Sequence, residues 1–306
     1  MQLLLFPNDF ESFNDWSKID WSTIYFTLFI LIAFLFILEK SFHLLAIILN
    51  IKKKDEINSF NRFVMDALAM GVFVLLGYNA LDKMGGWKEY FEIEASVDRL
   101  YVFNPYAAQL ALFQVAYELK SIHDVFYYGD GIIFFLHHIS TSILAFCALH
   151  PFCQLYACFF LGISEVSTFV LCCALPFDGE RGIPILHKKY EIILQILGVV
   201  FSILFFIYRC VIWPRVSYHF WKDCLLVLNT QGASHNDYVI YFFLFANAGL
   251  TSLQIAWLGE IVTTATSRLG MSDSKKKKNT SNNNNDSNNN NNGNVRRSAR
   301  NKTKAS

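Results

Sequence analysis

Long apolar stretches are the feature that most constrains how this chain can fold. A helix needs about 20 mostly apolar residues to cross the ~30 Å hydrocarbon core of a bilayer, where each unpaired backbone amide costs several kcal/mol. Six stretches meet this requirement, and a seventh, more polar one comes close to it. The sequence therefore predicts an all-α, polytopic membrane helix bundle of about seven spans. By residue number these are 21–38, 63–81, 102–119 (the more polar one), 132–149, 152–175, 192–213 and 239–265.

The composition agrees with a lipid solvent. With 54% hydrophobic and 17% charged residues, the 306-residue chain has more apolar surface than a soluble core of this length can bury. Stretch 102–119 carries Gln109, Gln114 and Glu118, which suit a helix that faces other helices or a wet cavity rather than lipid. An interfacial helix is the alternative for this stretch, and it would leave six spans.

The charges of the loops predict the orientation, because short loops rich in Lys and Arg tend to stay in the cytosol. The loop after the first span and the loop around residues 181–189 are basic, whereas residues 82–99 are acidic on balance. Seven spans place the N-terminus in the lumen and both basic loops in the cytosol. We therefore expect a lumenal segment 1–20, a first span with its basic loop 21–60, and a transmembrane domain 61–266.

The C-terminal segment 267–306 is basic and rich in Asn. It contains Lys275–Lys278, then runs of Asn and Ser with almost no apolar residue to drive folding, so a disordered cytosolic tail is expected. The last five residues, Lys302-Thr-Lys304-Ala-Ser, fit the dilysine pattern that retrieval coats bind on cytosolic tails. This pattern favours the endoplasmic reticulum or another internal membrane.

Two adjacent histidines, His137 and His138, lie about two turns inside the span 132–149. Imidazole groups are costly inside a membrane and mark functional or structural polar contacts there. Neighbouring helical positions project about 100° apart, so one ring can face a central cavity while the other meets a flanking helix. Thr141 follows one turn later and can bond an imidazole or a backbone carbonyl.

The next span contributes Ser164 and Glu165 near mid-membrane, where a carboxyl group is expected to be paired or protonated. A contact between Glu165 and one of the histidines would orient the ring and favour proton transfer. Later spans add further polar candidates for the lining of the same cavity. These are Gln195, Arg209 and Asn247. A purely structural role, as hydrogen bonds that hold helices together, is the alternative for all of these side chains.

The segment His137-His138-Ile-Ser-Thr141 resembles the core motif of the TLC-domain family, which includes ceramide synthases. Asp124 upstream, the Ser164-Glu165 region, the sequence 208–214 (YRCVIWP) and Asn247 with Trp257 follow in the order of that family. The chain is most similar to its small members, the transmembrane protein 56 homologues. The resemblance implies a TLC-type domain over 61–266 and a role in lipid homeostasis of internal membranes.

Ceramide synthases transfer an acyl group from acyl-CoA to an amine. The resemblance to them implies that His137 and His138 occupy the positions of their catalytic histidines. This chain has Gly162-Ile-Ser-Glu-Val-Ser where those enzymes carry an acidic pair in the next span. We therefore expect a protein that binds, senses or handles a membrane lipid, with an acyl-CoA-dependent acyltransferase as the alternative and a structural scaffold as a third. The sequence predicts no cofactor, no metal site and no nucleic-acid partner.

Overall fold

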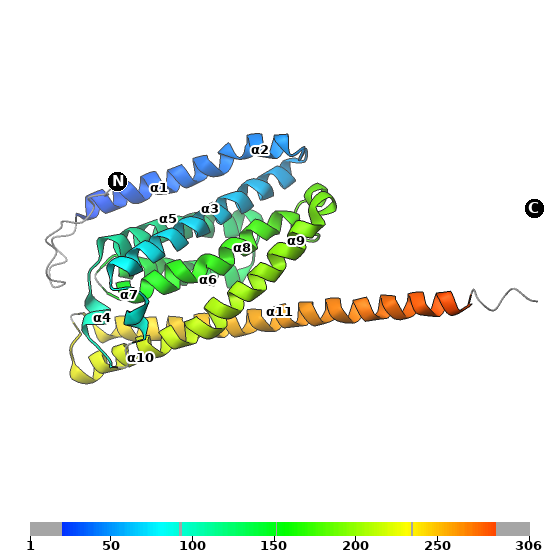
Figure 1. Ribbon diagram of the computed structural model, residues 1–306. Coiled ribbons are helices and arrows are strands. Elements are labelled where there is room, and N and C mark those ends of the chain that lie inside the picture. Colours follow the sequence, from blue (N-terminus) through cyan, green and yellow to red (C-terminus); the bar gives the residue numbers. More distant parts are fainter. Residues whose placement is uncertain (1–19, 92–93, 151, 234, 286–306) are drawn as a thin grey trace, which may run out of the picture. The chain divides into compact units, whose positions relative to one another are not determined.

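The computed structural model describes residues 20–91, 94–150, 152–233 and 235–285. Within these ranges the regular structure is helical and contains no strand (Figure 1). The chain divides into two compact units, Met1–Ile255 and Ala256–Ser306. The predicted lumenal segment 1–20 lies outside the described residues except for Asp20, which caps the first helix by accepting a hydrogen bond from Thr23 N.

Each of the seven predicted spans corresponds to a helix or to a run of consecutive helical segments, which confirms the all-α membrane bundle. Five of these are long and apolar enough to cross a bilayer, α6 is apolar but has only 17 residues, and α5 is more polar. In chain order the elements are α1 (Trp21–Ser41) with α2 (His43–Ile48), α3 (Lys54–Lys83), the short α4 (Asp98–Tyr101), α5 (Pro105–Tyr128), α6 (Ile132–Ala148), α7 (Gln154–Ala157) with α8 (Val166–Ala174), α9 (Pro184–Phe205) with α10 (Trp213–Thr230), and α11 (Asp237–Asn285).

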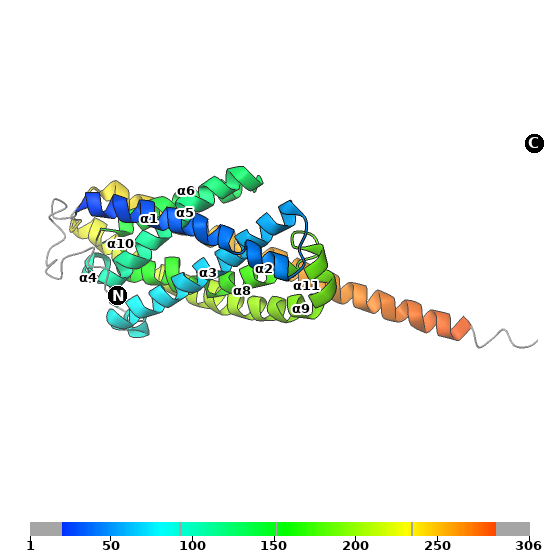
Figure 2. The ribbon, with the colours of Figure 1, turned by 90° about the horizontal axis from the view of Figure 1, so that it is seen from above.

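Helix α5 is the innermost helix of the first unit. It packs against α1, α3 and α6 (Figure 2). Most of its side chains are buried, including those of Gln114, Glu118, Lys120 and Asp124. Polar groups at membrane depth are tolerated where neighbouring helices satisfy them. The prediction that this polar stretch faces other helices is therefore confirmed.

The helix that follows α6 is irregular where it approaches α3 most closely. A π-helical turn, Cys158–Gly162, joins α7 to a short 3₁₀ turn, Ile163–Glu165, which leads into α8. Gly77 of α3 lies against this turn: a Cβ atom added at Gly77 would lie 2.9 Å from the Cα atom of Gly162. Two glycines facing each other allow the backbones to approach closely, as small residues do in membrane helix pairs.

The sixth span is longer than predicted. Helices α9 and α10 are joined by a second π-helical segment, Phe206–Ile212, and the helical run continues to Thr230. The predicted spans end at residue 213 and begin again at residue 239. Instead Val216, Phe220 and Val227 form a buried stripe along α10 at helical spacing, and only 231–236 connects it to α11.

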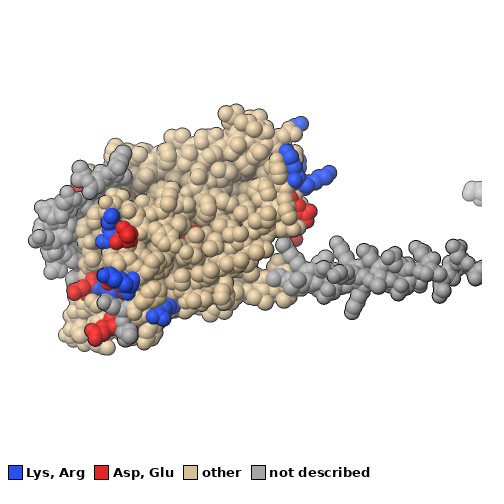
Figure 3. Space-filling view, in the orientation of Figure 1, with Lys and Arg blue, Asp and Glu red and all other residues tan. Residues whose placement is uncertain are grey.

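Charged side chains gather at the two ends of the bundle. Figure 3 shows Lys, Arg, Asp and Glu at both ends of one face, with almost only other residues between them. Many apolar side chains of the predicted spans are exposed, among them Phe29 and Phe34 of α1 and Ile196 of α9. This pattern fits a belt in contact with lipid hydrocarbon.

Buried ion pairs hold the first helix to the bundle. Lys120 of α5 has no exposed surface, and its Nζ lies 2.6 Å from Glu39 Oε2 of α1 and 2.5 Å from Asp124 Oδ2. At the other end of the bundle, Asp223 of α10 accepts hydrogen bonds from the Arg99 guanidinium and from the Tyr156 hydroxyl. These contacts tie α1 and the 84–101 connection to the helices that carry the polar site.

Helix α11 continues as far as Asn285, into the segment that the sequence predicts to be disordered. The stretch between residues 256 and 285 contains no proline and few glycines, so nothing in its covalent structure interrupts the helix. Residues 286–306, with the rest of the Asn-rich tail and its dilysine pattern, lie outside the described residues.

Candidate functional site

The two histidines lie in the second turn of α6, which begins at Ile132 after a left-handed Gly129 ends α5. Their ring centroids are 5.3 Å apart, with an interplanar angle of 65°. The rings thus diverge, as adjacent helical positions require. His138 faces α5, whereas Glu118, Glu165 and Arg209 from three other helical segments lie close enough to His137 to act on it electrostatically.

His138 pairs with a carboxylate. Its Nδ1 lies 2.6 Å from Glu118 Oε2, and the other oxygen of Glu118 accepts a hydrogen bond of 2.5 Å from Gln114 Nε2. Glu118 is only 2% exposed and His138 is partly buried. A carboxylate on one imidazole nitrogen fixes the tautomer and leaves the other nitrogen as the group available for a proton or a ligand.

Glu118 is a site residue that sequence reasoning missed. It was noted only as a polar residue of an ambiguous span, beside Gln114. The signal was nevertheless present, because Gln114 and Glu118 are four residues apart on one helix face and both are costly in lipid. What the sequence lacked was the knowledge that this face of α5 meets α6.

Glu165 has a different partner from the one expected. Arg209 Nη2 lies 2.9 Å from Glu165 Oε1 and 3.2 Å from the Thr168 hydroxyl, and the guanidinium also lies over the Trp213 ring at 5.3 Å. The carboxylate is therefore bound by a permanent cation rather than by a histidine. An arginine satisfies a membrane carboxylate better than an imidazole does, because it remains charged at any physiological pH.

Both partners of this ion pair lie at irregular turns. Glu165 ends the 3₁₀ turn that follows the first π-helical turn, and Arg209 lies within the second π-helical segment. π-Helical turns are rare and are frequent at functional sites, because they shift the direction of the side chains that follow. The irregular turns thus help to bring Glu165 and Arg209 toward the histidine pair.

The other predicted site residues have separate positions. Ser164 is buried, and its hydroxyl donates to the Phe160 carbonyl of its own helix. Asn247 of α11 accepts a hydrogen bond from Trp221 and donates one to Ser217, both on α10. Gln195 is exposed on α9, so it is not part of the polar group around the histidines.

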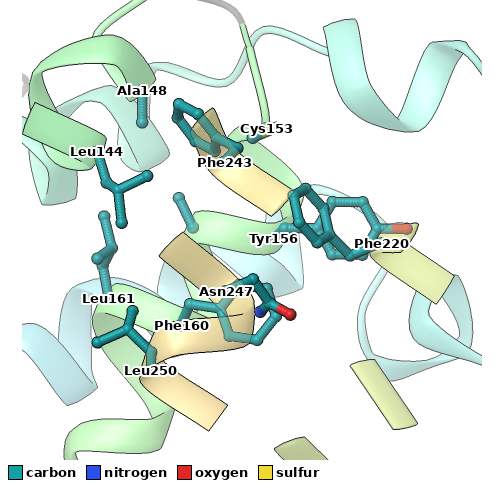
Figure 4. A pocket seen from close by; sticks show the side chains of 11 residues that line it. Leu144, Ala148, Cys153, Tyr156, Phe160, Leu161, Phe220, Phe243, Asn247 and Leu250 are labelled. Carbon is teal, nitrogen blue, oxygen red and sulfur yellow. The ribbon is translucent and has the colours of Figure 1, made fainter. Parts of the chain in front are cut away.

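An apolar cavity of about 40 Å³ lies between α6, α7 with the first π-helical turn, α10 and α11 (Figure 4). This volume holds about three water-sized groups, so it accommodates a part of an acyl chain and not the whole of one. Leu144 and Ala148 line it from α6, Leu161 from the π-helical turn, and Asn247 and Leu250 from α11. Neither histidine is among the residues that line this cavity.

The cavity and the polar group nevertheless share the same helix faces. On α6, His137, Thr141, Leu144 and Ala148 follow one another at spacings of three and four residues, which places them on one side of the helix. Glu165 follows Leu161 of the cavity lining by four residues on the next span. The polar group is therefore about 10 Å along α6 from the cavity lining, given a rise of 1.5 Å per residue.

A bundle of apolar helices that encloses a buried His, Glu and Arg group, with an apolar cavity farther along α6, defines a polytopic membrane protein. The family model described as the TLC domain (TRAM, LAG1 and CLN8) matches residues 57–263, about two thirds of the chain. The chain belongs to this family. A search of curated proteins found no match. The predicted likeness to the transmembrane protein 56 homologues stays a prediction.

Proposed function

We propose that this protein binds a membrane lipid at the internal site and acts in lipid homeostasis of the endoplasmic reticulum or another internal membrane. The observation that carries the proposal is the shared face of α6, on which His137 and Thr141 lead directly to Leu144 and Ala148 of the apolar cavity. A lipid has the same two-part chemistry: a polar group that needs hydrogen-bond partners and a chain that needs an apolar environment.

The charges support a bound ligand rather than an ordinary packing contact. A helix bundle can be joined by weak hydrogen bonds of about 0.6–2 kcal/mol each, without any ionisable group. Here four ionisable side chains approach His137, and each is costly to bury in a membrane. They are Glu118 of α5, His138 of α6, and Glu165 and Arg209 of the two irregular turns. Membership of the TLC domain family is consistent with a lipid as the ligand.

Photolabelling tests this proposal. Cells that express the full chain are fed a photoreactive, clickable fatty acid, which enters all lipid classes, and the protein is purified after irradiation. We expect label on peptides from 137–161 by mass spectrometry, with about tenfold less label at these peptides in His137→Ala and His138→Ala. The exposed His43 of α2 supplies the control, His43→Ala, which should label as wild type does. Equal labelling in all four proteins would contradict the proposal.

A second candidate is an acyl-CoA-dependent lipid acyltransferase, and the contact between His138 and Glu118 favours it. With Nδ1 bound to the carboxylate, His138 Nε2 is the general base. It takes the proton of a lipid hydroxyl or amine, whose oxygen or nitrogen attacks the thioester carbonyl carbon. The carbon–sulfur bond then breaks, the acyl group stays on the acceptor, and the proton moves from His138 to the departing thiolate of coenzyme A.

The carboxylate distinguishes the two candidates. Glu118→Gln keeps the size of the side chain but removes the charge that favours the imidazolium formed during transfer, so an enzyme should lose 10²-fold or more in kcat. A lipid-binding protein should lose at most about tenfold in lipid affinity. Radiolabelled oleoyl-CoA with glycerolipid, sterol and sphingoid acceptors measures the first quantity, and photolabelling measures the second. Glu191→Gln on the exposed surface of α9 is the matched control.

The orientation and location remain part of the proposal. The basic loop 52–62 and the basic residues 181–189 support a cytosolic side at the end of the bundle where α3 begins and α8 ends. We infer a lumenal N-terminus and a cytosolic C-terminus. Glycosylation sites introduced at 84–97 should be modified in microsomes, and sites introduced at 178–182 should not; the reverse result would overturn this orientation.

A further inference from the structure

Two buried polar atoms on the helices α6 and α11, each one turn from a residue that lines the apolar cavity but not in its lining, lack a partner within the described part of the chain. Thr141 Oγ1 of α6 and Gln254 Oε1 of α11 belong to side chains that are 5% and 4% exposed, and neither has a hydrogen bond. Buried side-chain polar atoms are nearly always hydrogen-bonded, and each exception calls for an explanation. In lipid the cost of leaving them unpaired is especially high.

Helical register places both atoms at the same end of the cavity. In Figure 4, Ala148 and Phe243 lie together at one end of the lining, while Leu161 and Leu250 lie toward the other. Thr141 precedes Leu144 by about one helical turn, and Leu144 lies between Thr141 and Ala148 along α6. Gln254 is one turn beyond Leu250 on the buried stripe of α11, on the side away from Phe243.

The polar neighbours of Gln254 on α11 have hydrogen-bond partners, which sets the Gln254 oxygen apart. On α11, Asn247 bonds to Trp221 and Ser217, and the Thr251 hydroxyl accepts a hydrogen bond from Trp213. Gln254 continues this stripe with an acceptor oxygen that no group among the described residues reaches. One turn beyond the cavity lining, α6 and α11 thus carry one hydroxyl and one amide oxygen that can bind a molecule other than this chain.

We propose that Thr141 and Gln254 bind the hydroxyl group of an uncharged lipid whose chain begins in the apolar cavity between α6 and α11. A hydroxyl both donates and accepts, so it can donate its hydrogen to the Gln254 oxygen and accept a hydrogen bond from the Thr141 hydroxyl. A phosphate diester or an ester carbonyl only accepts and leaves Gln254 Oε1 unpaired. The assignment rests on the proposed lipid site and names the class of ligand for it.

The charges beside this end exclude an anionic headgroup as the better ligand. Arg209, a cation on the second π-helical segment that acts on His137, is already bound to Glu165 and Thr168. Glu118 and His138 likewise form a pair. A lipid phosphate would have to compete with Glu165 for the arginine, whereas an uncharged hydroxyl leaves both pairs intact. The narrow cavity of about 40 Å³ also favours one slender chain over two.

Photolabelling of the full chain in nanodiscs tests the assignment. Three probes share one diazirine-bearing sixteen-carbon chain and differ in the polar end: the alcohol, its methyl ether and its phosphate monoester. We expect the alcohol to label the lining of α6 and α11, and the ether and the phosphate to label it at least threefold less. Thr141→Val and Gln254→Leu should each weaken labelling by the alcohol about threefold to tenfold, and Thr141→Ser should retain it.

An exposed glutamine supplies the control. Gln195→Leu makes the same change of residue type as Gln254→Leu but at an exposed position of α9, and this variant should be labelled as wild type is. Each variant's melting temperature is measured without probe, and Gln254→Leu should not lower it, because it removes a buried atom that has no partner. A variant that loses both folding and labelling is replaced by Gln254→Met, which keeps the length of the side chain.

The outcomes separate this inference from the function it rests on. Equal labelling by the alcohol and the ether, or full labelling in both Thr141→Val and Gln254→Leu, overturns the hydroxyl assignment while leaving a lipid site in place. Stronger labelling by the phosphate overturns the uncharged class. Absence of label in the lining with all three probes, together with unchanged fatty-acid labelling in the histidine variants, overturns the lipid site itself.

Discussion

At the scale of single residues, buried ionisable side chains on different helices form pairs in this molecule. Glu165 binds Arg209 rather than a histidine, and His138 binds Glu118. Such pairs are weak evidence for stability, because desolvation offsets most of the attraction. Their main effect is on orientation, because each pair fixes where an imidazole or a guanidinium group points inside the bundle.

The pair of Arg209 and Glu165 gives a prediction about stability. Arg209→Met should cost about 3 kcal/mol, because it leaves a mostly buried carboxylate without its cation. The double variant Arg209→Met/Glu165→Met should recover most of the loss, since no charge then remains unpaired. Melting temperatures in detergent measure both effects. A double variant that is as unstable as the single one would show that packing, and not charge pairing, dominates at this position.

Sequence reasoning reached part of this site. It selected His137, His138, Glu165 and Arg209 because ionisable groups are costly in a membrane, and the structure brings these four near one another. It did not select Glu118, and it grouped Gln195 with the cavity although that side chain is exposed. A helix sequence shows which residues share a face, but not which neighbour that face meets.

At the scale of helices, two close contacts hold the elements that carry the site. One is the crossing of α3 with the first π-helical turn at Gly77 and Gly162, and the other is the contact of α1 with α5 through Glu39 and Lys120. The first depends on the absence of side chains and the second on buried charges. Each contact therefore fails under a different kind of substitution.

Gly77→Ala should destabilise the bundle by about 2 kcal/mol. The added Cβ would lie 2.8 Å from the Cys158 carbonyl oxygen and 2.9 Å from Ile163 N, both backbone atoms that cannot rotate away. Gly198→Ala on α9 is the matched control, because nothing lies within 4 Å of its added Cβ and alanine favours the helix by up to ~1 kcal/mol. Thermal unfolding of both variants checks the prediction, and equal melting temperatures would contradict it.

The contact of α1 with α5 should respond asymmetrically to substitution. Lys120→Met removes the buried cation of Asp124 and leaves Glu39 only its contact with the exposed Lys40, so it should cost about 3–5 kcal/mol. Glu39→Gln should cost only about 1 kcal/mol, because Lys120 keeps Asp124 and the amide oxygen still accepts a hydrogen bond. Lys40→Met should cost at most about 1 kcal/mol, because the Lys40 side chain is 61% exposed although its Nζ lies 3.3 Å from Glu39 Oε1. Melting temperatures give the order, and equal losses for Lys120→Met and Glu39→Gln would refute it.

At the scale of the whole molecule, His150 links α1, the end of α6 and the 231–236 connection. It is 2% exposed, and its ring lies 5.2 Å from that of Trp21. Burial, together with a smaller effect of the nearby His235, lowers the pKa of His150 to about 4. The folded protein therefore resists a proton that the unfolded chain accepts near pH 6.5.

The bundle should accordingly lose stability between pH 6.5 and pH 4. In this window the unfolded chain binds more protons than the folded one, so the free energy of unfolding falls as the pH falls. The contribution of His150 is fully present above pH 6.5. His150→Phe, which keeps a ring against Trp21, should flatten the melting temperature between pH 7 and pH 5. An unchanged slope in this variant would assign the pH dependence to other groups.

The sequence by itself determined that this chain crosses a membrane as helices, because runs of about 20 apolar residues have no other stable state in lipid. It also determined which residues are too polar to face that lipid. Tertiary structure alone decided how these residues pair, that α10 continues the sixth span, and that the apolar cavity lies along α6 from the histidines rather than beside them. These outcomes depend on the rotation of each helix against its neighbours and on two π-helical turns, and neither is encoded in the periodicity of a single segment.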